Sequence, residues 1–370
     1  MSTNILLYGE WKGNLGDDLF VRCICDRYPK VTFHIFTDID YAHIYEDITN
    51  LRLHFTNNKV IKGINILGSK ANLPDLYYYS LRKTCDAAVF LGGSLYQQEG
   101  DWMQVYRKRK EILDTYGTAF VIGGNFGPYT DSNFFDVYHY FFSKMKDVCF
   151  RDSYSAELFS KELDNVRCAP DVVLGLPDIP KGETFDKLSA VISVIDLGYD
   201  SVSRKSLNIT PEDYEKWIAG LALVLEKKGF RVTLMGFCGQ EGDHNAIVRI
   251  MHKYAGQFKD THMYFHGDVQ ESLALLNGAE CIFATRLHAM ILAWRMNKAV
   301  LPLVYDKKML NVLEQYDPEG YYLPLSDLLK VSPEEAFDNM SAAWDFSALK
   351  DEAEKQFSGL DKWLAARRDF

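Results

Sequence analysis

The chain contains 370 residues, of which 47% are apolar and 25% charged, with 41 Lys and Arg against 51 Asp and Glu. This composition is typical of a folded globular protein and excludes intrinsic disorder, and the length suits two domains. The formal net charge of −10 argues against a general nucleic-acid binder, because no basic surface is in excess to neutralise phosphates. A small anionic ligand remains compatible with the sequence where a few Arg and Lys side chains converge.

Three sequence features bear on the cellular compartment. No segment reaches the roughly 18 consecutive apolar residues that a membrane-spanning helix needs. The first apolar run, residues 5–8, is too short for a signal peptide and has no basic segment before it. Seven Cys are scattered without dense spacing, which indicates a reducing compartment and not a disulfide framework. These features predict a cytoplasmic protein.

Short apolar runs typical of buried parallel strands alternate with helical segments along the whole chain. The predicted strands cover residues 5–8, 31–36, 87–91, 119–122 and 148–150, followed by residues 190–195, 231–235, 281–284 and 299–304. The clearest helix begins after Thr210, with Pro211 in its first position, and ends at Gly229. This alternation predicts doubly wound α/β domains.

A stretch with Pro and Gly and without apolar periodicity, residues 178–189, predicts the boundary between two domains. We expect an N-terminal Rossmann-like domain over residues 1–180, a C-terminal Rossmann-like domain over residues 188–330, and C-terminal helices over residues 331–370. The fold class is therefore α/β, with two doubly wound domains that face a central cleft, and the cleft is the default ligand site.

Glycine-bearing loops follow three predicted strands of the first domain. These loops contain Gly13, Asn14 and Gly16 after the first strand, Gly92, Gly93 and Ser94 after the strand 87–91, and Gly123 and Gly124 after the strand 119–122. Asp17 is placed to cap the helix after the first loop. A turn with a helix cap explains the first loop as well as a ligand loop does, and paired glycines are common where strands turn into helices. Three such strand ends together favour a functional sheet edge.

Cationic side chains follow two other strands. Arg151 comes directly after one strand, where its guanidinium can bind a carboxylate or phosphate in bidentate fashion. An ion pair with Asp152 or Asp171 is the competing explanation. Lys307 and Lys308 follow the last predicted strand, and either add positive charge to the cleft or form a solvated turn.

The segment around Arg286 and His288 is the most informative. Both residues lie at the N-terminus of a predicted helix that is apolar on all sides. A cation there opposes the helix dipole, so an Arg and a His together are best explained by an anionic group bound between them. His is also the side chain best suited to acid–base chemistry near neutral pH. No His, Asp or Glu pattern has metal-ligand spacing, and no metal is expected.

The order of these segments resembles the polysaccharide pyruvyl transferase family. The matching parts are residues 13–17, residues 91–94, Arg151 and Asp152 with Ser155, Pro170 and Asp171, Arg286-Leu287-His288-Ala289, and Tyr305 with Lys308. The resemblance extends from about residue 5 to about residue 310. The sequence departs from the family pattern in Ser94, where a third glycine is usual, and in Ala299, where a proline is common.

This resemblance implies an enzyme with two Rossmann-like domains in a glycosyltransferase-B-like layout. Such an enzyme transfers the pyruvyl group of phosphoenolpyruvate to a sugar of a cell-surface polysaccharide or its precursor, as a ketal across two hydroxyls. The match implies that Arg151, Arg286, Leu287 and His288 bind phosphoenolpyruvate, and Lys308 is counted with this donor site.

The implied roles can be assigned residue by residue. We expect His288 to act as acid and base, Arg286 to stabilise the departing phosphate, and Asp17 to accept a proton from the acceptor. The expected partners are phosphoenolpyruvate and a glycan acceptor, either free or lipid-linked, with no tightly bound cofactor. A lipid-linked acceptor would bring the protein to the inner face of a membrane.

Two other functions compete with this one. A nucleotide-sugar glycosyltransferase of the same architecture also needs an anion site at a helix N-terminus. A non-catalytic glycan-binding relative would keep the fold and use exposed aromatic side chains. Arg151, Arg286 and His288 count against the second alternative, because a binding protein has no need of them.

Overall fold

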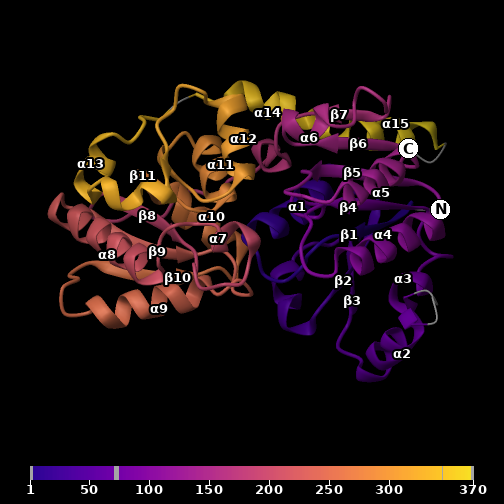
Figure 1. Ribbon diagram of the computed structural model, residues 1–370, viewed down its shortest axis with the longest axis horizontal. Helices are drawn as coiled ribbons and strands as arrows, with labels where there is room; N and C mark the ends of the chain where they lie inside the picture. Colours follow the sequence, from indigo (N-terminus) through magenta and orange to yellow (C-terminus); the bar gives the residue numbers. More distant parts are fainter. Residues whose placement is uncertain (1–2, 71–74, 344, 368–370) are drawn as a thin grey trace. The chain divides into compact units, whose positions relative to one another are not determined.

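The computed structural model describes residues 3–70, 75–343 and 345–367, and the chain divides into two compact units. Unit 1 contains Met1–Lys12, Phe20–Val172 and Glu352–Phe370, and unit 2 contains Gly13–Leu19 and Val173–Asp351. Each unit has its own parallel sheet with helices packed on it (Figure 1). The two α/β domains predicted from the alternation of strands and helices are therefore present.

Unit 1 is built on a parallel sheet with a buried centre. Its described strands are β1 (Asn4–Tyr8), β2 (Thr32–Thr37), β3 (Leu51–Phe55), β4 (Ala87–Leu91), β5 (Ala119–Gly124), β6 (Asp147–Phe150) and β7 (Val166–Cys168). They lie in the order β3-β2-β1-β4-β5-β6-β7, and neighbouring strands are parallel. Every residue of β4 and β5 is buried, as expected when both faces of a sheet are covered.

The helices of unit 1 connect these strands. They are α1 (Leu15–Arg27), η1 (Ile39–Tyr45), α2 (Lys59–Lys70), α3 (Leu76–Ser80), α4 (Trp102–Tyr116), α5 (Ser132–Ser143) and α6 (Ser153–Glu157), with η2 (Val172–Gly175) at the end of the unit. The first residues of α1 are counted with unit 2, and the rest of this helix with unit 1. The strand order reverses between β1 and β4, and doubly wound sheets bind ligands at such a switch point, beyond the carboxyl ends of the strands.

The last residues of the chain return to unit 1. They form the end of α14 (Ser347–Ala353), η4 (Glu354–Phe357) and α15 (Ser358–Ala366), and α15 lies beside β6 (Figure 1). The buried Gln356 accepts a hydrogen bond from the Gly123 backbone N–H at 2.9 Å and donates to the Ala169 carbonyl at 2.7 Å. Trp363 packs edge-on against Phe120 of β5.

Unit 2 repeats the doubly wound plan. Its described strands are β8 (Ser189–Val194), β9 (Arg231–Gly236), β10 (Thr261–Phe265), β11 (Cys281–Ala284), β12 (Ala299–Val304) and β13 (Leu323–Pro324). They lie in the order β10-β9-β8-β11-β12-β13, and all pairs are parallel. The order reverses between β8 and β11, which places the switch point next to the loop that contains Arg286.

The helices of unit 2 confirm the predicted start after Thr210. They are α7 (Val202–Lys205), α8 (Pro211–Lys227), α9 (Asp243–Tyr254), α10 (Val269–Gly278), α11 (Leu287–Arg295), α12 (Lys307–Tyr316), η3 (Leu325–Lys330) and α13 (Pro333–Asp338). The Thr210 side chain caps α8 and the Ser332 side chain caps α13, each followed by a proline in the first turn. In the part of the chain that the structure describes, no helix is both long and apolar enough to cross a membrane.

The observed division differs from the expected linear domains in three places. Gly13–Leu19, inside the expected N-terminal domain, is counted with unit 2. The switch between units falls at Val172, before the Pro- and Gly-rich stretch 178–189. The expected C-terminal helices, residues 331–370, are shared between the units: α13 packs on α8 in unit 2, whereas the chain from Glu352 onward belongs to unit 1. Contacts such as those of Gln356 join residues far apart in the chain, and local sequence patterns carry no sign of them.

Candidate anion-binding and active site

The loop between β11 and α11 places the residues that the sequence singles out. Arg286 is the N-cap residue of α11, and Leu287 and His288 form its first turn, both half-buried. The helix is buried from Ala289 to Trp294, as its apolar sequence predicts. The N-terminus of a buried helix therefore carries a guanidinium and an imidazole, at the switch point of the unit 2 sheet.

Arg286 is held by two carboxylates from the segment after β9. Its Nε donates to Asp243 Oδ2 at 3.0 Å, and its Nη2 donates to the other oxygen of the same carboxylate. Its Nη1 donates to Glu241 Oε2 at 2.7 Å. Asp243 is fully buried and also accepts hydrogen bonds from the backbone N–H groups of Phe237 and Cys238, so it is a fixed partner of the guanidinium.

A second buried arginine, Arg204 of α7, meets the same Glu241 carboxylate. Arg204 Nη2 donates to Glu241 Oε2, and Nη1 donates to the Asp196 carbonyl at 2.8 Å. Burial raises the pKa of Glu241, but the charges of Arg286 and Arg204, with a contribution from Lys308, outweigh it and lower the pKa to about 2. Glu241 is therefore an ionised carboxylate between two guanidinium groups.

The predicted residue Lys308 lies in the first turn of α12 and contributes positive charge to this cluster. Its Nζ is 3.5 Å from Asp306 Oδ2, and its side chain is largely buried. The neighbouring Tyr305 ring lies 5.7 Å from the Arg204 guanidinium carbon. Three cationic side chains, from α7, α11 and α12, thus meet at the carboxyl ends of the unit 2 strands.

The glycine-rich segment after β1 packs on His288. A Cβ atom on Gly16 would lie 1.8 Å from His288 Nδ1, so only glycine allows the imidazole to lie against this backbone. Gly13 has a φ of +68°, which also favours glycine. The Leu15 N–H donates to the Phe237 carbonyl at 3.1 Å, which joins the segment to the loop after β9. Two motifs that are distant in the sequence therefore form one structure.

A buried His–Asp pair fixes the same segment from the other side. His266 Nε2 lies 3.0 Å from Asp18 Oδ2, and both side chains are excluded from solvent. His266 Nδ1 lies 2.8 Å from Ser272 Oγ. Asp18 therefore anchors the first turn of α1 to the segment after β10, and it lies close in the chain to the glycine that supports His288.

The prediction that Asp17 caps α1 is wrong. The helix starts at Leu15, and Asn14 is its cap, because the Asn14 side chain accepts a hydrogen bond from the Gly16 N–H at 3.3 Å. Asp17 lies two residues further on, inside the first turn, where its carboxylate accepts from Asn14 Nδ2 at 2.9 Å. Both residue types suit a helix start, and the prediction placed the start three residues too late.

Arg151 is placed in unit 1, in a buried network. Its Nη1 donates to Asp171 Oδ2 at 3.0 Å and its Nη2 donates to Asn125 Oδ1 at 2.8 Å. The Arg151 and Asp171 side chains are each 2% exposed. Of the two explanations that the sequence allowed, the structure shows the ion pair with Asp171. Asp152 instead caps α6, where its carboxylate accepts from the Ser155 N–H at 2.8 Å.

The glycine loop after β4 lies against Arg151. A Cβ atom on Gly93 would lie 2.3 Å from the guanidinium carbon of Arg151, and Gly92 has a φ of +125°. The Gly93 carbonyl accepts a hydrogen bond from the Asn125 N–H at 3.0 Å, while Ser94 is exposed. The structure thus brings Gly93 together with Arg151, as it brings Gly16 together with His288.

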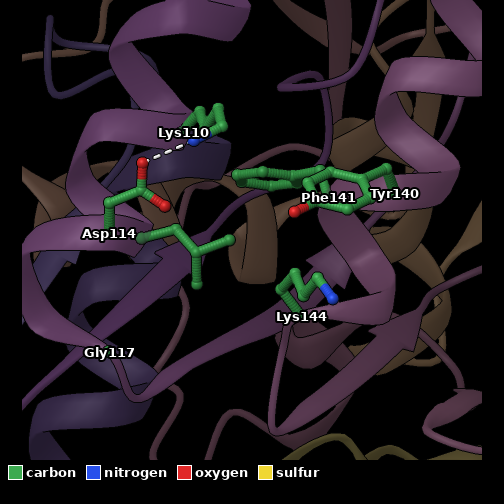
Figure 2. Close-up of a pocket in the computed structure, with 7 residues that line it drawn as sticks. Lys110, Asp114, Gly117, Tyr140, Phe141 and Lys144 are labelled. Atoms are coloured by element: carbon green, nitrogen blue, oxygen red, sulfur yellow. Dashed lines mark hydrogen bonds and ion pairs between the residues drawn. The ribbon is translucent and has the colours of Figure 1, made fainter.

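Two hollows in the structure are lined by other residues than these predicted ones. Figure 2 shows a pocket of about 290 Å³ on α4 and α5 of unit 1, lined by residues that include Lys110, Asp114, Tyr140 and Lys144. Lys110 is paired there with Asp114 at 2.5 Å. Gly117, also in the lining, directly precedes β5, so this pocket lies toward the amino ends of the strands and away from the switch point.

A larger hollow of about 870 Å³ lies in unit 2 on α8 and α9. Its lining includes Asp196 and Glu215, and both carboxylates pair with Arg249. Asp196 also joins this hollow to the arginine cluster through its carbonyl, which binds Arg204. Within the described residues, no group of three or more His, Cys, Asp and Glu side chains is arranged to hold a metal ion.

Sequence reasoning missed Arg204, Glu241 and Asp243. The last two lie in a segment that begins after β9 and contains Gly239 and Gly242, which is the same signal of glycines at a strand end that was used in the first domain. Arg204 had no such signal, because it lies on a short helix inside a long connection. Its position at the cluster depends on the fold.

Solved structures define the class of fold. MnaA of S. aureus, in a structure with UDP, has a TM-score of 0.57 at 10% identity, with 99% of this chain and 97% of that chain covered. HepE of Anabaena, in a structure with UDP and glucose, has a TM-score of 0.55 at 9% identity, with 99% of each chain covered. At such identities the likeness concerns the fold alone. The chain has the glycosyltransferase-B-like fold of two Rossmann-like α/β domains.

The sequence comparisons identify the family. The sequence model of the polysaccharide pyruvyl transferase family matches residues 14–307, which include the segments around Arg151 and Arg286. The chain belongs to this family. It is also 22% identical over 255 residues to AmsJ of Erwinia amylovora, an amylovoran biosynthesis protein, with 63% of this chain covered. The matched region spans 60% of the length of AmsJ.

Proposed function

We propose that this chain transfers the pyruvyl group of phosphoenolpyruvate to a sugar of a cell-surface polysaccharide or its precursor, and forms a pyruvate ketal. Membership of the polysaccharide pyruvyl transferase family supports a transferase of polysaccharide biosynthesis. The observation that carries the finer proposal is the cluster at the N-terminus of α11, where Arg286 and Arg204 bind the Glu241 carboxylate and Lys308 adds positive charge. The donor is a small molecule with a carboxylate and a phosphate, and such a cluster suits it.

The proposed donor site lies wholly in unit 2. Arg286 and Arg204 bind one anionic group of the donor, and Lys308 with the backbone N–H groups at the start of α11 adds positive potential. Leu287 lines the same turn. Arg151 is assigned no contact with the donor in this proposal, because its guanidinium is buried against Asp171 and Asn125. Its role is to support the Gly92–Gly93 loop at the switch point of unit 1.

His288 is the proposed acid and base. A proton goes to the methylene carbon of the donor, one sugar hydroxyl attacks the developing cation at the adjacent carbon, and the second hydroxyl then replaces phosphate. The two acceptor hydroxyls supply two protons in total, of which one ends on the new methyl group and one on phosphate. Arg286 and Arg204 stabilise the charge on the leaving phosphate as the C–O bond breaks.

Asp17 is the proposed base on the acceptor side. It lies one residue from Gly16, which supports the His288 ring, and its carboxylate is held by the Asn14 side chain. A carboxylate on the segment that supports His288 suits the removal of a hydroxyl proton from the acceptor, while His288 acts on the donor. The second hydroxyl of the acceptor must also lose a proton, in the step that closes the ketal.

Calorimetric titration of the purified protein with phosphoenolpyruvate, UDP and CMP tests the donor. We expect saturable binding of phosphoenolpyruvate, and loss of that binding in Arg286→Lys, because a lysine lacks the guanidinium fork. Arg295→Lys is the matched control, since Arg295 ends the same helix and donates to the Leu176 carbonyl at 2.7 Å. Binding of UDP or CMP without any binding of phosphoenolpyruvate would overturn the proposal in favour of a nucleotide-sugar glycosyltransferase.

Phosphate release with a panel of glycan acceptors tests the reaction. We expect acceptor-dependent release of phosphate, with a loss of roughly 10²–10⁴-fold in kcat for His288→Gln, the usual contribution of general acid–base catalysis. Full turnover in His288→Gln would remove His288 from the mechanism. Release of a nucleotide from a nucleotide sugar, with no phosphate release from phosphoenolpyruvate, would replace the proposed reaction.

A further inference from the structure

We propose that Glu241 occupies the place of the donor's anionic group in the unliganded protein, and that phosphoenolpyruvate binds by displacing this carboxylate from Arg204 and Arg286. This inference rests on the proposed function and adds a residue that controls donor affinity. It also makes Arg204 a donor-binding residue together with Arg286. The family resemblance assigns neither Arg204 nor Glu241.

The two carboxylates that bind Arg286 differ in how firmly they are held. Asp243 accepts two hydrogen bonds from the guanidinium and two from backbone N–H groups, and it is fully buried. Glu241 uses a single oxygen, Oε2, for both arginines. Its side chain is 31% exposed, against 9% for Arg286 and 1% for Arg204. Glu241 is therefore the member of the cluster that solvent and a solute reach first.

In the proposed exchange the Glu241 side chain turns away from the arginines, while its backbone carbonyl still accepts from Arg204 Nη1 at 3.4 Å. The segment around Glu241 has glycines that allow such a change. Gly239 and Gly242 flank it, and Gly242 has a φ of +79°, in a region that L side chains rarely adopt. Gly239 and Gln240 are exposed. Because Asp243 holds the start of α9 through its own hydrogen bonds, Glu241 can move without the helix.

Both arginines stay in place when Glu241 leaves. Arg286 keeps its two bonds to Asp243, and Arg204 keeps its bond to the Asp196 carbonyl and its position over the rings of Tyr199 and Tyr305. Arg204 Nε is buried and has no hydrogen-bond partner among the described residues. An unused buried donor is costly, and an incoming anion would satisfy it.

The exchange sets donor affinity and specificity. A neutral or weakly anionic molecule does not replace a carboxylate that is bound to two guanidinium groups, whereas a dianion or trianion does. Each donor molecule that binds must first break the Glu241 pairs, so the measured affinity is lower than the intrinsic one. Removing the Glu241 charge should therefore tighten binding of phosphoenolpyruvate.

The test compares wild type, Glu241→Gln and Glu241→Ala by calorimetric titration with phosphoenolpyruvate. We expect both variants to bind roughly tenfold more tightly or better, the ratio that corresponds to one charge-assisted hydrogen bond. Glu314→Gln is the matched control, because it removes the same charge from an exposed position on α12 of the same unit and should leave the affinity unchanged. Thermal unfolding and circular dichroism verify that each variant is folded.

The outcomes separate this inference from the proposed function. Binding by wild type with equal or weaker binding by both Glu241 variants overturns the inference alone, and Glu241 is then a fixed support of the arginines. Absence of phosphoenolpyruvate binding in wild type and in both variants overturns the proposed function and the inference with it. A crystal structure of the complex gives a second readout: Glu241 Oε2 should lie beyond hydrogen-bond distance of Arg286 Nη1, and an unchanged pair would contradict the exchange.

Discussion

Arg151 in unit 1 and Arg286 in unit 2 come from the same sequence context and have different surroundings. Each follows a buried parallel strand and precedes a helix. Arg151 is paired with Asp171 and Asn125, and it and Asp171 are each 2% exposed. Arg286 has one fully buried partner, Asp243, and one partner that solvent reaches, Glu241.

The comparison suggests why the proposed donor site lies at Arg286: of the two guanidinium groups, only this one has a partly exposed carboxylate partner. Breaking a buried ion pair leaves a carboxylate without compensation, which costs about 3–5 kcal/mol. A ligand that reached Arg151 would carry this cost, because Asp171 has no access to water. A ligand that reaches Arg286 displaces Glu241 into solvent, where an ionised carboxylate is well hydrated.

The largest expected difference between the two arginines is in catalysis. Arg286→Lys keeps a positive charge beside Asp243 but loses the fork that joins Asp243 and Glu241, so we expect kcat/KM to fall by roughly 10³-fold. Arg151→Lys should leave kcat/KM of the folded protein within a few-fold of wild type. Steady-state phosphate release measures both. Equal losses in the two variants would show that Arg151 also touches the donor.

For stability we expect the opposite order, in which the loss of Arg151 has a large effect on the free energy of unfolding. Arg151→Met removes the guanidinium that pairs with the buried Asp171 carboxylate, so we expect the free energy of unfolding to fall by about 3 kcal/mol. The double variant Arg151→Met, Asp171→Asn also removes the charge of the buried Asp171 carboxylate and should recover part of that loss. Denaturant titration followed by circular dichroism gives both values. A single variant as stable as wild type would mean that Asp171 is not buried as described.

Two glycines sharpen the comparison, because each lies under one of the compared groups. Gly16→Ala pushes a Cβ atom against the His288 ring, and we expect a loss of roughly 10²-fold in kcat from the displaced imidazole. Gly93→Ala pushes against the Arg151 guanidinium, and we expect reduced stability with kcat nearly unchanged in the folded fraction. Measuring kcat and unfolding for both variants checks the pair. A Gly16→Ala enzyme with normal kcat would show that the position of His288 is not critical.

The central strands and the Arg286–His288 turn were predictable from the sequence, and the sheet edges were not. Each of the four strands that the prediction missed, β3, β7, β10 and β13, lies at an edge of a sheet. Edge strands have mixed burial, as β10 shows with one buried residue followed by half-buried and exposed residues in alternation, so they lack the continuous apolar runs of β4 or β8. The pattern that identifies buried strands is absent from them for a physical reason.

The candidate site was predictable to the same degree. Arg286 and His288 stand out because charge at the N-terminus of an apolar helix is unusual. Their partners Glu241 and Arg204 could not be found in this way, since they come from other connections and meet Arg286 only in the folded unit. For Arg151 the sequence allowed both an anion site and an ion pair, and only the burial of Asp171 separates them.

The smallest expected effect concerns pH and tests the state of Glu241. The two guanidinium groups lower the pKa of Glu241 to about 2, below its ordinary value, so the ion pairs are fully present above about pH 4.5 and are lost as the pH falls through about 2. The ratio of the donor affinity of Glu241→Gln to that of wild type should therefore be constant from pH 5 to pH 9. Calorimetric titration of both proteins across this range measures the ratio, in which the titration of the donor itself cancels. A ratio that rises with pH inside this range would mean that Glu241 titrates there, which requires that its carboxylate is not paired with Arg204 and Arg286.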